Sequence, residues 1–205
     1  YSQQSVQPFL LLDSLRRLDL APQRAADLQI ATLDISPRIN EHFARAKAAA
    51  GGRGASYVLH LPLDLSVRWQ PALLDYWRTA GSAIGTNAHD ATRPTPAVDV
   101  RRVTIRPAEV ARVSPFDLNV VTQLFSGAPF DLVIATNVLV YYDTLDQSLA
   151  LTNIERMLRP GGLLLSNNAL LELPGSSMRS AGYTTVVYSD RLDDGDHIVW
   201  YRRER

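Results

Sequence analysis

The sequence predicts an α/β fold with a mostly parallel sheet, and three patterns lead to that prediction. Strand-like apolar segments alternate with amphipathic helices along the 205 residues, as the crossovers between parallel strands require. The last pattern, at residues 183–202, is typical of an antiparallel hairpin around Asp194–Gly195. Polar side chains follow several of the strands, at the edge where open α/β sheets bind their ligands.

The first half of the chain is predicted to begin with a helix and to continue with strands and further helices. Apolar residues recur at helical spacing over residues 9–18. The apolar run at residues 28–34 indicates a buried strand, and Ser36 and Pro37 are typical of the N-cap and first turn of a helix. The segments that follow are predicted as a strand at residues 57–61, a helix at 71–79, a loop at 82–99 and a strand at 100–106.

The second half shows a more regular alternation. We expect a short third core strand at residues 110–113, followed by a turn at Ser114–Pro115. Residues 130–137 read as a buried strand, and residues 144–160 as a helix that Pro160–Gly161–Gly162 ends. A second buried strand is expected at residues 163–168, before the terminal hairpin.

Composition limits the possible functions. Lys and Arg number 21 and so do Asp and Glu, so no net field recruits nucleic acid or an anionic membrane, and we expect neither as a partner. Cysteine is absent, which excludes disulfides and thiol chemistry and favours a reducing, cytoplasmic location. The four histidines show no ligand-type spacing, so no metal site is expected.

Three predicted strand ends carry polar side chains. Asp34 ends the first strand, residues 117–119 lie at a turn, and Asn137 ends the strand at 130–137 with Tyr141 four residues later. A carboxylate at such an end can accept two hydrogen bonds from a ribose diol, and backbone and amide groups can read an adenine edge. The arrangement favours a nucleoside-bearing cofactor.

Each of these residues also has a purely structural explanation. Asp34 could help to cap the helix that follows it, and Asp117 could be an ordinary turn residue. Asn137 could satisfy nearby backbone groups. Tyr141 and Tyr142 could be core aromatic residues with solvated hydroxyls.

These segments together resemble a known family. "FDLVIATNVLVYYD", with a helix and "LRPGGLLLSNN" after it, resembles the late motifs of class I S-adenosylmethionine-dependent methyltransferases. "NVLVYYD" is most similar to the Asn-Val-Leu-x-Tyr-Phe-Asp pattern of the chemotaxis receptor (CheR-type) methyltransferases. "IATLDIS" resembles that family's second motif, and the opening "YS" resembles the end of its glycine-rich segment.

The resemblance implies a Rossmann-like class I sheet, S-adenosylmethionine as cofactor, and one catalytic domain over residues 1–205. A small β-subdomain is expected as an insert at about residues 51–110, where Trp69, Tyr76 and Trp77 either set acceptor specificity or simply pack. The implied cofactor-binding residues are Asp34 and Ile35 near the ribose, Asp117, Leu118 and Asn119 near adenine, and Asn137 and Val138 at the methionine end. Tyr141 is the implied catalytic residue, facing the methyl group and placing the acceptor.

Departures from the family pattern narrow these expectations. The glycine-rich loop and the first core strand do not occur in these residues, and the chain starts without Met, so we expect an upstream part and weak cofactor binding without it. Thr136 stands where the family usually has Arg, and the family's helical receptor-binding domain is not seen, so receptor glutamates are not the expected acceptor.

The expected acceptor is therefore a carboxylate, hydroxyl or amine of a small molecule or a protein side chain. The alternative is a catalytically inactive methyltransferase-like scaffold, which a degenerate glycine loop upstream would indicate. A nicotinamide-dependent oxidoreductase would need G-x-G-x-x-G, which this sequence lacks.

Overall fold

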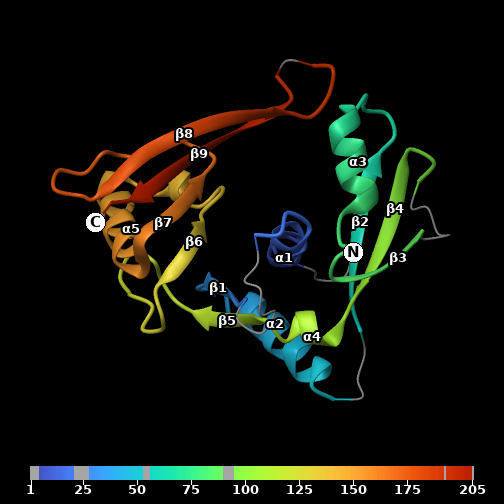
Figure 1. The fold of residues 1–205 in the computed structure, drawn as a ribbon, viewed down its shortest axis with the longest axis horizontal. Helices are drawn as coiled ribbons and strands as arrows, with labels where there is room; N and C mark the ends of the chain where they lie inside the picture. Colours follow the sequence, from blue (N-terminus) through green and yellow to red (C-terminus); the bar gives the residue numbers. More distant parts are fainter. Residues whose placement is uncertain (1–4, 21–27, 53–55, 90–94, 192, 205) are drawn as a thin grey trace. The chain divides into compact units, whose positions relative to one another are not determined.

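The computed structural model describes residues 5–20, 28–52, 56–89, 95–191 and 193–204 (Figure 1). The opening Tyr1–Ser2, compared above with a glycine-rich segment, lies outside these described residues. The chain forms two compact units, residues 1–117 and residues 118–205, which are described separately below. Among the described residues, no helix combines the length and apolar character of a membrane span.

The first unit contains a parallel strand pair and a separate antiparallel sheet. Its elements are α1 (Gln7–Arg17), β1 (Ile30–Asp34), α2 (Pro37–Ala50), β2 (Tyr57–Asp64), α3 (Pro71–Thr79), β3 (Gly85–His89), β4 (Val98–Ile105), α4 (Pro107–Val110) and β5 (Val113–Asp117). Strands β1 and β5 pair in parallel, whereas β2, β4 and β3 pair antiparallel in that order. As the sequence predicts, α2 begins after the N-cap Ser36 with Pro37 in its first turn.

The antiparallel sheet and α3 lie within the segment expected to form an insert, although the limits of that insert stay a prediction. The loop prediction for residues 82–99 is wrong at Gly85–His89, which forms β3 by pairing with β4 from Gly85↔Ile105 onward. Cross-strand pairing therefore overrides the weak strand propensity of this segment. Trp69 and Trp77 donate hydrogen bonds to the carbonyls of Asp64 and Leu61, which favours the packing explanation for these two residues.

The third core strand also lies later than predicted. It begins at Val113 and continues to Asp117, so Pro115 is inside the strand and not in a turn. β5 is an edge strand of the two-stranded sheet, where a residue without an N–H group is tolerated. Residues 107–110 form the short helix α4 instead.

One apolar core joins α1, α2 and the antiparallel sheet. Its buried members are Phe9, Leu12, Phe43, Leu59, Leu61, Ala80, Ile84, Val103, Ile105, Val110 and Val113. The rings of Phe9 and Tyr57 pack at the margin of this core, with centroids 4.7 Å apart. The helix that opens the chain is therefore part of the first unit's interior.

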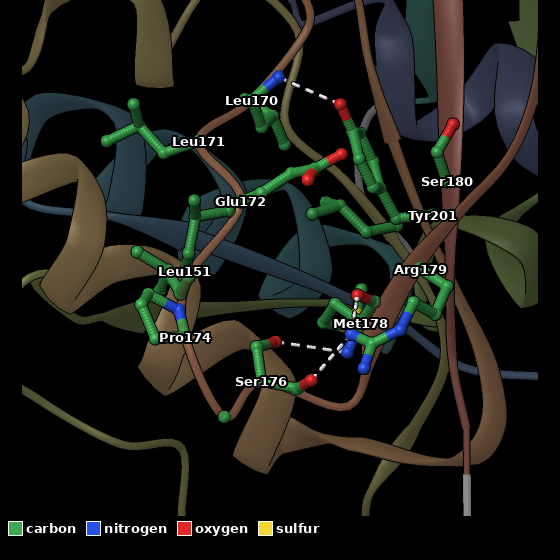
Figure 2. A pocket seen from close by; sticks show the side chains of 13 residues that line it. Leu151, Leu170, Leu171, Glu172, Pro174, Ser176, Met178, Arg179, Ser180 and Tyr201 are labelled. Atoms are coloured by element: carbon green, nitrogen blue, oxygen red, sulfur yellow. Dashed lines mark hydrogen bonds between the residues drawn. The ribbon is translucent and has the colours of Figure 1, made fainter.

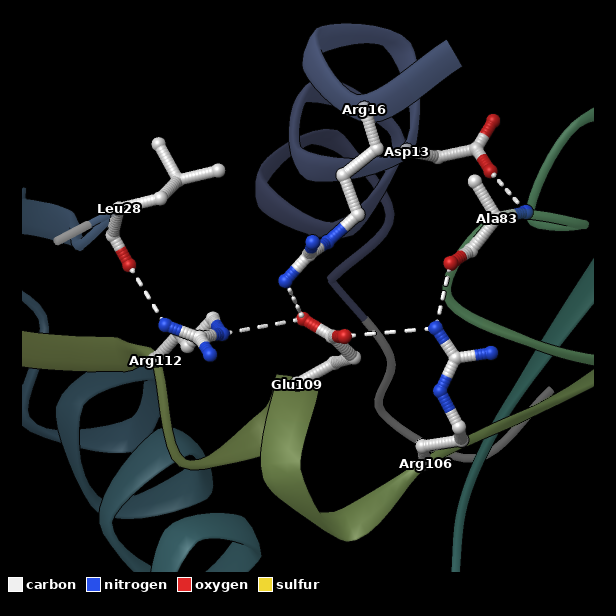
Figure 3. Close-up of polar contacts among 7 residues, drawn as sticks. All are labelled: Asp13, Arg16, Leu28, Ala83, Arg106, Glu109 and Arg112. Carbon is white, nitrogen blue, oxygen red and sulfur yellow. Dashed lines mark hydrogen bonds and ion pairs between the residues drawn. The ribbon is translucent and has the colours of Figure 1, made fainter. Parts of the chain in front are cut away.

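Buried charges hold α1 in place beside this core (Figure 3). The Glu109 carboxylate in α4 accepts hydrogen bonds from Arg16 at 2.9 Å, Arg112 at 3.1 Å and Arg106 at 3.3 Å, and Glu109 is only 5% exposed. The fully buried Asp13 accepts from Arg17 at 2.8 Å and from the amide of Ala83 at 2.9 Å. These bonds fix α1 to α4 and to the turn before β3.

The second unit is a four-stranded sheet with one long helix. Its elements are β6 (Phe130–Ile134), the 3₁₀ helix η2 (Leu139–Tyr141), α5 (Thr144–Met157), β7 (Leu158–Ser166), β8 (Met178–Val187) and β9 (Gly195–Arg203). The strand order is β6-β7-β9-β8, with β6 and β7 parallel and the other pairs antiparallel. The fully buried or nearly buried residues include Leu139, Ala150, Leu151, Ile154, Met157, Leu158 and Leu164.

The helix α5 begins as predicted but ends earlier. Asp143 caps it by accepting a hydrogen bond from the amide of Asp146 at 2.9 Å. The helix stops at Met157, and β7 starts at once with Leu158 pairing Phe130. Gly161, with a φ of 80°, therefore lies in the irregular first part of β7. The sequence had predicted that this glycine ends the helix.

The predicted fold class is confirmed: the chain is a mixed α/β protein with parallel strand pairs and a terminal antiparallel hairpin, consistent with a Rossmann-like class I fold. Among the described strands, β1 pairs only with β5, and β6 pairs only with β7. All five residues of β1 are half-buried, whereas strands inside a parallel sheet are normally covered on both faces. Among the described strands, each parallel pair therefore has an open edge within its own unit.

Candidate functional site

The carboxyl ends of β1 and β5 bring two predicted site residues side by side. Asp34 and Asp117 are register partners in this parallel pair. The Asp34 Oδ1 atom accepts a hydrogen bond from the Ser36 amide at 2.8 Å, and its backbone carbonyl accepts one from the Asn40 side chain at 2.8 Å. Asp34 thus does fix the start of α2, as its structural explanation proposed. Its second oxygen, Oδ2, has no such bond among the described residues and can accept from a ligand.

Apolar side chains accompany these carboxylates. Ile35, which follows Asp34, is 64% exposed, and Phe116, which precedes Asp117, is 37% exposed. A flat heterocycle can pack against exposed apolar groups of this kind while a nearby carboxylate accepts its ribose hydroxyls. Both side chains therefore suit a nucleoside better than a free anion.

Leu118 and Asn119, the next two predicted residues, belong to the second unit, where one is buried and the other stabilises a turn. Leu118 is 7% exposed, so only its backbone is available to a ligand. The Asn119 side chain accepts from the amide of Val121 at 2.9 Å, and the Asn119 amide donates to Gln123 Oε1 at 2.7 Å. Asn119 thus organises a turn, and a contact of either residue with adenine stays a prediction.

Asn137 lies at the carboxyl end of β6 in an uncommon conformation. Its φ of 55° is left-handed, which only one other non-glycine residue, Asp19, shares among the described residues. Its amide donates to Asn167 Oδ1 at 2.9 Å, and Asn167 Nδ2 donates to Asn137 Oδ1 at 2.6 Å. The hydrogen bonds of Asn137 therefore reach a residue that follows the neighbouring strand β7, and not its local backbone. Such strain is typical of ligand-binding positions.

The segment after Asn137 presents side chains to solvent. Val138 is 41% exposed, and Tyr141, in η2, is 79% exposed, so the core explanation is wrong for Tyr141. Gln147 in α5 fixes this segment by donating from Nε2 to the carbonyl of Leu139 at 3.0 Å. The Tyr141 side chain is thus exposed to solvent, while Gln147 holds the backbone of the same segment at Leu139.

The predicted residues gather at two places. Asp34 and Asp117 meet in the first unit, and Asn137, Val138 and Tyr141 follow one another in the second. Among the described residues, no group of three or more metal-ligating side chains forms.

Sequence reasoning missed two residues in this region. Asn167 could have been found, because it ends the strand "LLLSNN" next to the strand that precedes Asn137. Gln147 gave no signal, because its role depends on how α5 packs beside η2.

The comparisons with known proteins locate one family match. Residues 81–166 match a family described as a methyltransferase domain. This segment includes Asp117, Asn137, Val138 and Tyr141, and the match agrees with the predicted enzyme class and with S-adenosylmethionine as its cofactor. No curated protein sequence matches the chain.

Solved structures give distant similarities. The N-methyltransferase NodS from Bradyrhizobium japonicum WM9, in complex with S-adenosyl-L-homocysteine, is 17% identical with a TM-score of 0.35, over 46% of this chain and 56% of that chain. A second NodS structure has 17% identity and a TM-score of 0.36, over 49% and 67% of the two chains. The glycopeptide N-methyltransferase MtfA, also with S-adenosyl-L-homocysteine, has 15% identity and a TM-score of 0.27, over 65% and 55%.

These similarities in sequence and structure are low. The chain spans 56% of the first of these proteins and 55% of MtfA. The match to a methyltransferase domain over residues 81–166, together with the mixed α/β topology, supports a class I methyltransferase.

Proposed function

We propose that this chain is the catalytic domain of an S-adenosylmethionine-dependent methyltransferase, of the class I type and most similar to the CheR-type family. The observation that carries the proposal is the placement of polar residues at the carboxyl end of each parallel pair. Asp34 and Asp117 share one such end, and Asn137 with Asn167 shares the other. The methyltransferase-domain match over residues 81–166 supports the same function.

The residues divide the work of binding and positioning. In this proposal Asp34 accepts the ribose hydroxyls through its free Oδ2 atom, while Ile35 and Phe116 pack against the base. Asn137 and Val138 line the methionine end, and the exposed Tyr141 hydroxyl orients the acceptor atom.

When bound, S-adenosylmethionine supplies a methyl group already activated by the sulfonium, so the protein has mainly to align donor and acceptor. A carboxylate acceptor needs no general base, whereas a hydroxyl or amine must lose a proton during the transfer. The acceptor in this proposal is a carboxylate, hydroxyl or amine of a small molecule or a protein side chain.

The open strand edges complete the proposal. We infer that a strand with a glycine-rich loop, supplied from outside residues 1–205, contributes the remaining wall of the cofactor site. The unpaired edges of β1 and β6 support this inference, because exposed parallel edges otherwise leave backbone groups without partners. The chain without that segment is then expected to bind the cofactor weakly.

Calorimetric titration of the longest natural form of the protein with S-adenosylmethionine tests the proposal. Asp34→Asn keeps an acceptor for the Ser36 amide but removes the charge, so we expect binding to weaken by about tenfold to a hundredfold. Asp131→Asn is the matched control, since Asp131 lies near the amino end of β6 and pairs with Arg159. No binding by the unaltered protein would favour the inactive scaffold.

The role of Tyr141 is tested by measuring single-turnover rates of methyl transfer, once an acceptor has been identified. Tyr141→Phe is expected to slow transfer by about tenfold or more while leaving cofactor affinity unchanged. Tyr183→Phe is the control, because Tyr183 is similarly exposed, at 71%, but lies on β8. Equal rates for both variants would remove Tyr141 from the mechanism.

A further inference from the structure

A pocket of about 400 Å³ lies entirely within the second unit, beside α5 and the strands β7, β8 and β9 (Figure 2). Its walls combine apolar side chains, including Leu170 and Leu171 of the loop after β7 and Met178 at the start of β8, with the polar side chains of Glu172, Arg179 and Tyr201. A volume of this size lies within the range of small-molecule sites. None of the eight residues implied for cofactor binding or catalysis lines it.

The loop that forms one wall is held in place before any ligand arrives. The Glu155 carboxylate of α5 accepts from Ser176 Oγ at 2.6 Å, from the Ser177 amide at 2.9 Å and from Ser177 Oγ at 2.7 Å. Burial acts to raise the pKa of Glu155, but these bonds together with the charge of Arg203 lower it below the ordinary value. The ionised carboxylate therefore stabilises the pocket wall at neutral pH.

The polar groups at the pocket divide into those already in use and those that are free. Arg179 donates through Nη1 to the carbonyls of Ser176 at 2.6 Å and Met178 at 2.9 Å, and its Nε atom lies 3.9 Å from the Glu204 carboxylate. The Tyr201 hydroxyl accepts from the amide of Leu170 at 2.8 Å. Glu172 has no hydrogen bond or ion pair with any other described residue, and Figure 2 shows its side chain extending toward Tyr201.

This combination defines the charge of a suitable ligand. The carboxylate of Glu172 has no charge partner among the described residues, whereas the charge of Arg179 is already paired with Glu204. Apolar side chains next to one unpaired carboxylate complement a molecule with an apolar body and a single positive charge. A second hydrogen-bond donor is available from Tyr201, whose own proton has no acceptor among the described residues.

We propose that this pocket binds a small apolar amine, with its ammonium group paired to Glu172 and its hydrocarbon body against Leu171 and Met178. The site is separate from the proposed methyl transfer and does not depend on it. An alcohol of the same shape keeps the apolar contacts but loses the ion pair, and a carboxylate of the same shape is repelled.

The experiment uses three probes of similar size: n-hexylamine, n-hexanol and hexanoate. Each is titrated into the isotopically labelled full chain without S-adenosylmethionine, and amide shifts are followed by NMR. We expect n-hexylamine to bind about fivefold more tightly than n-hexanol, hexanoate to bind more weakly than both, and the shifts to cluster at residues 170–180.

Two variants make the test specific. Glu172→Gln is expected to reduce n-hexylamine binding to the level of n-hexanol, whereas Asp193→Asn, which removes an exposed carboxylate outside the pocket, is expected to change nothing. Thermal melting of each variant checks that it is folded. Equal binding of the three probes, unchanged amine binding by Glu172→Gln, or shifts located elsewhere would overturn the proposal.

The outcome is distinguishable from that of the methyltransferase proposal. Amine binding is measured without the cofactor, and cofactor binding is measured without an amine, so either result can fail while the other stands.

Discussion

The two units of this chain are stabilised in different ways. In the first unit, side chains far apart in sequence meet in a buried charged cluster, with Arg16 and Glu109 separated by 93 residues. In the second unit, four strands form one continuous ladder of backbone hydrogen bonds, and β8 and β9 pair over nearly their whole lengths. The first unit is therefore sensitive to single charged side chains, and the second is sensitive to changes in its loops and helix contacts.

The units also differ in how their strand ends present polar groups. Asp34 combines a structural bond to Ser36 with one free carboxylate oxygen. Asn137 has no such local task and is held instead by the reciprocal amide pair with Asn167. The Asp34 side chain is thus tied to its own local backbone, whereas the Asn137 side chain is tied to a residue of the neighbouring strand end.

Replacement of the buried carboxylate of the first unit should have the largest effect. Glu109→Gln leaves Arg16, Arg106 and Arg112 close together without their shared anion, and we expect a loss of about 3–5 kcal/mol in the free energy of unfolding. Chemical denaturation measures the loss. Hydrogen exchange should show faster exchange in α1 and the antiparallel sheet, with the second unit unchanged.

An exposed ion pair of the same unit provides the control. Glu41→Gln breaks the pair between Glu41 and Arg45, whose side chains are 69% and 63% exposed, and should cost less than about 0.5 kcal/mol. Equal losses for the two variants would contradict the view that buried charges hold the first unit.

In the second unit, Glu155→Gln should have a smaller and pH-dependent effect. The pKa of Glu155 is lowered in the folded state, so its contribution is present above the ordinary value of 4.5 and is lost as pH falls through the lower folded value. We expect a loss of about 1.5–3 kcal/mol at pH 7 from the weakened bonds to Ser176 and Ser177. Denaturation curves of the variant and the unaltered protein should therefore differ at neutral pH and converge at acidic pH.

A matched variant on the same sheet separates this effect from general charge removal. Glu204→Gln removes a carboxylate that is 60% exposed and lies 3.9 Å from Arg179, so stability should hardly change at either pH. A pH-independent loss for Glu155→Gln would show that the carboxylate charge is not what holds the loop.

Two substitutions of Asn137 separate backbone strain from side-chain function. Alanine in the left-handed conformation costs about 1 kcal/mol more than glycine, so Asn137→Ala should be less stable than Asn137→Gly by that amount. Both variants lose the hydrogen bond from Asn167 Nδ2 to the Asn137 side chain and keep the one that the Asn137 backbone amide donates, and both should weaken cofactor binding alike. Denaturation and calorimetry together give the two quantities.

If Asn137→Gly keeps full cofactor affinity, the side chain has no binding role and only the backbone conformation matters. If the two variants are equally stable, the left-handed conformation is not retained in solution.

The smallest expected effect is a pH dependence in the first unit. Burial, and then the charge of Arg45, lower the pKa of His42, whose Nε2 atom lies 2.8 Å from the Tyr57 hydroxyl. The unfolded chain binds a proton near the ordinary value of 6.5, whereas the folded chain does so only at lower pH. The free energy of unfolding should therefore fall as pH drops below 6.5.

His42→Gln should flatten this dependence, as measured by denaturation between neutral and mildly acidic pH. His197→Gln, an exposed position in the second unit, is the control and should leave the slope unchanged. A slope that persists in His42→Gln would assign the pH dependence to another group.

The sequence predicted the structure best where an element depends on residues close to it in the chain. The strand predicted at residues 130–137 forms over residues 130–134, the following helix begins at Thr144 as predicted, and the predicted terminal hairpin forms between β8 and β9. These three elements follow from local pattern and turn chemistry. β3 and β5 were misplaced, because pairing with β4 and with β1 decides their limits. Local propensity cannot report such pairing.

The site shows the same division. The sequence could place Asp34 and Asn137 at strand ends, with Tyr141 shortly after, because the strand-end rule needs only the strand limits, whereas their roles toward a ligand stay a prediction. The Glu109 cluster and the pocket at Glu172 were not found, since their residues come together only through packing of distant elements. The hydrogen-bond partners of Asn119 also could not be predicted, because they depend on the turn that it forms with Val121 and Gln123.

In the second unit, the Gln147 side chain connects the segment before Tyr141 to the rim of the pocket through hydrogen bonds. Its amide nitrogen holds the carbonyl of Leu139, next to Tyr141, and its amide oxygen accepts from the amide of Leu171 at 3.3 Å, at the rim of the pocket. A ligand that displaces Leu171 must lengthen or rotate this bridge. Linkage then works in both directions: any factor by which an amine changes acceptor affinity equals the factor by which the acceptor changes amine affinity.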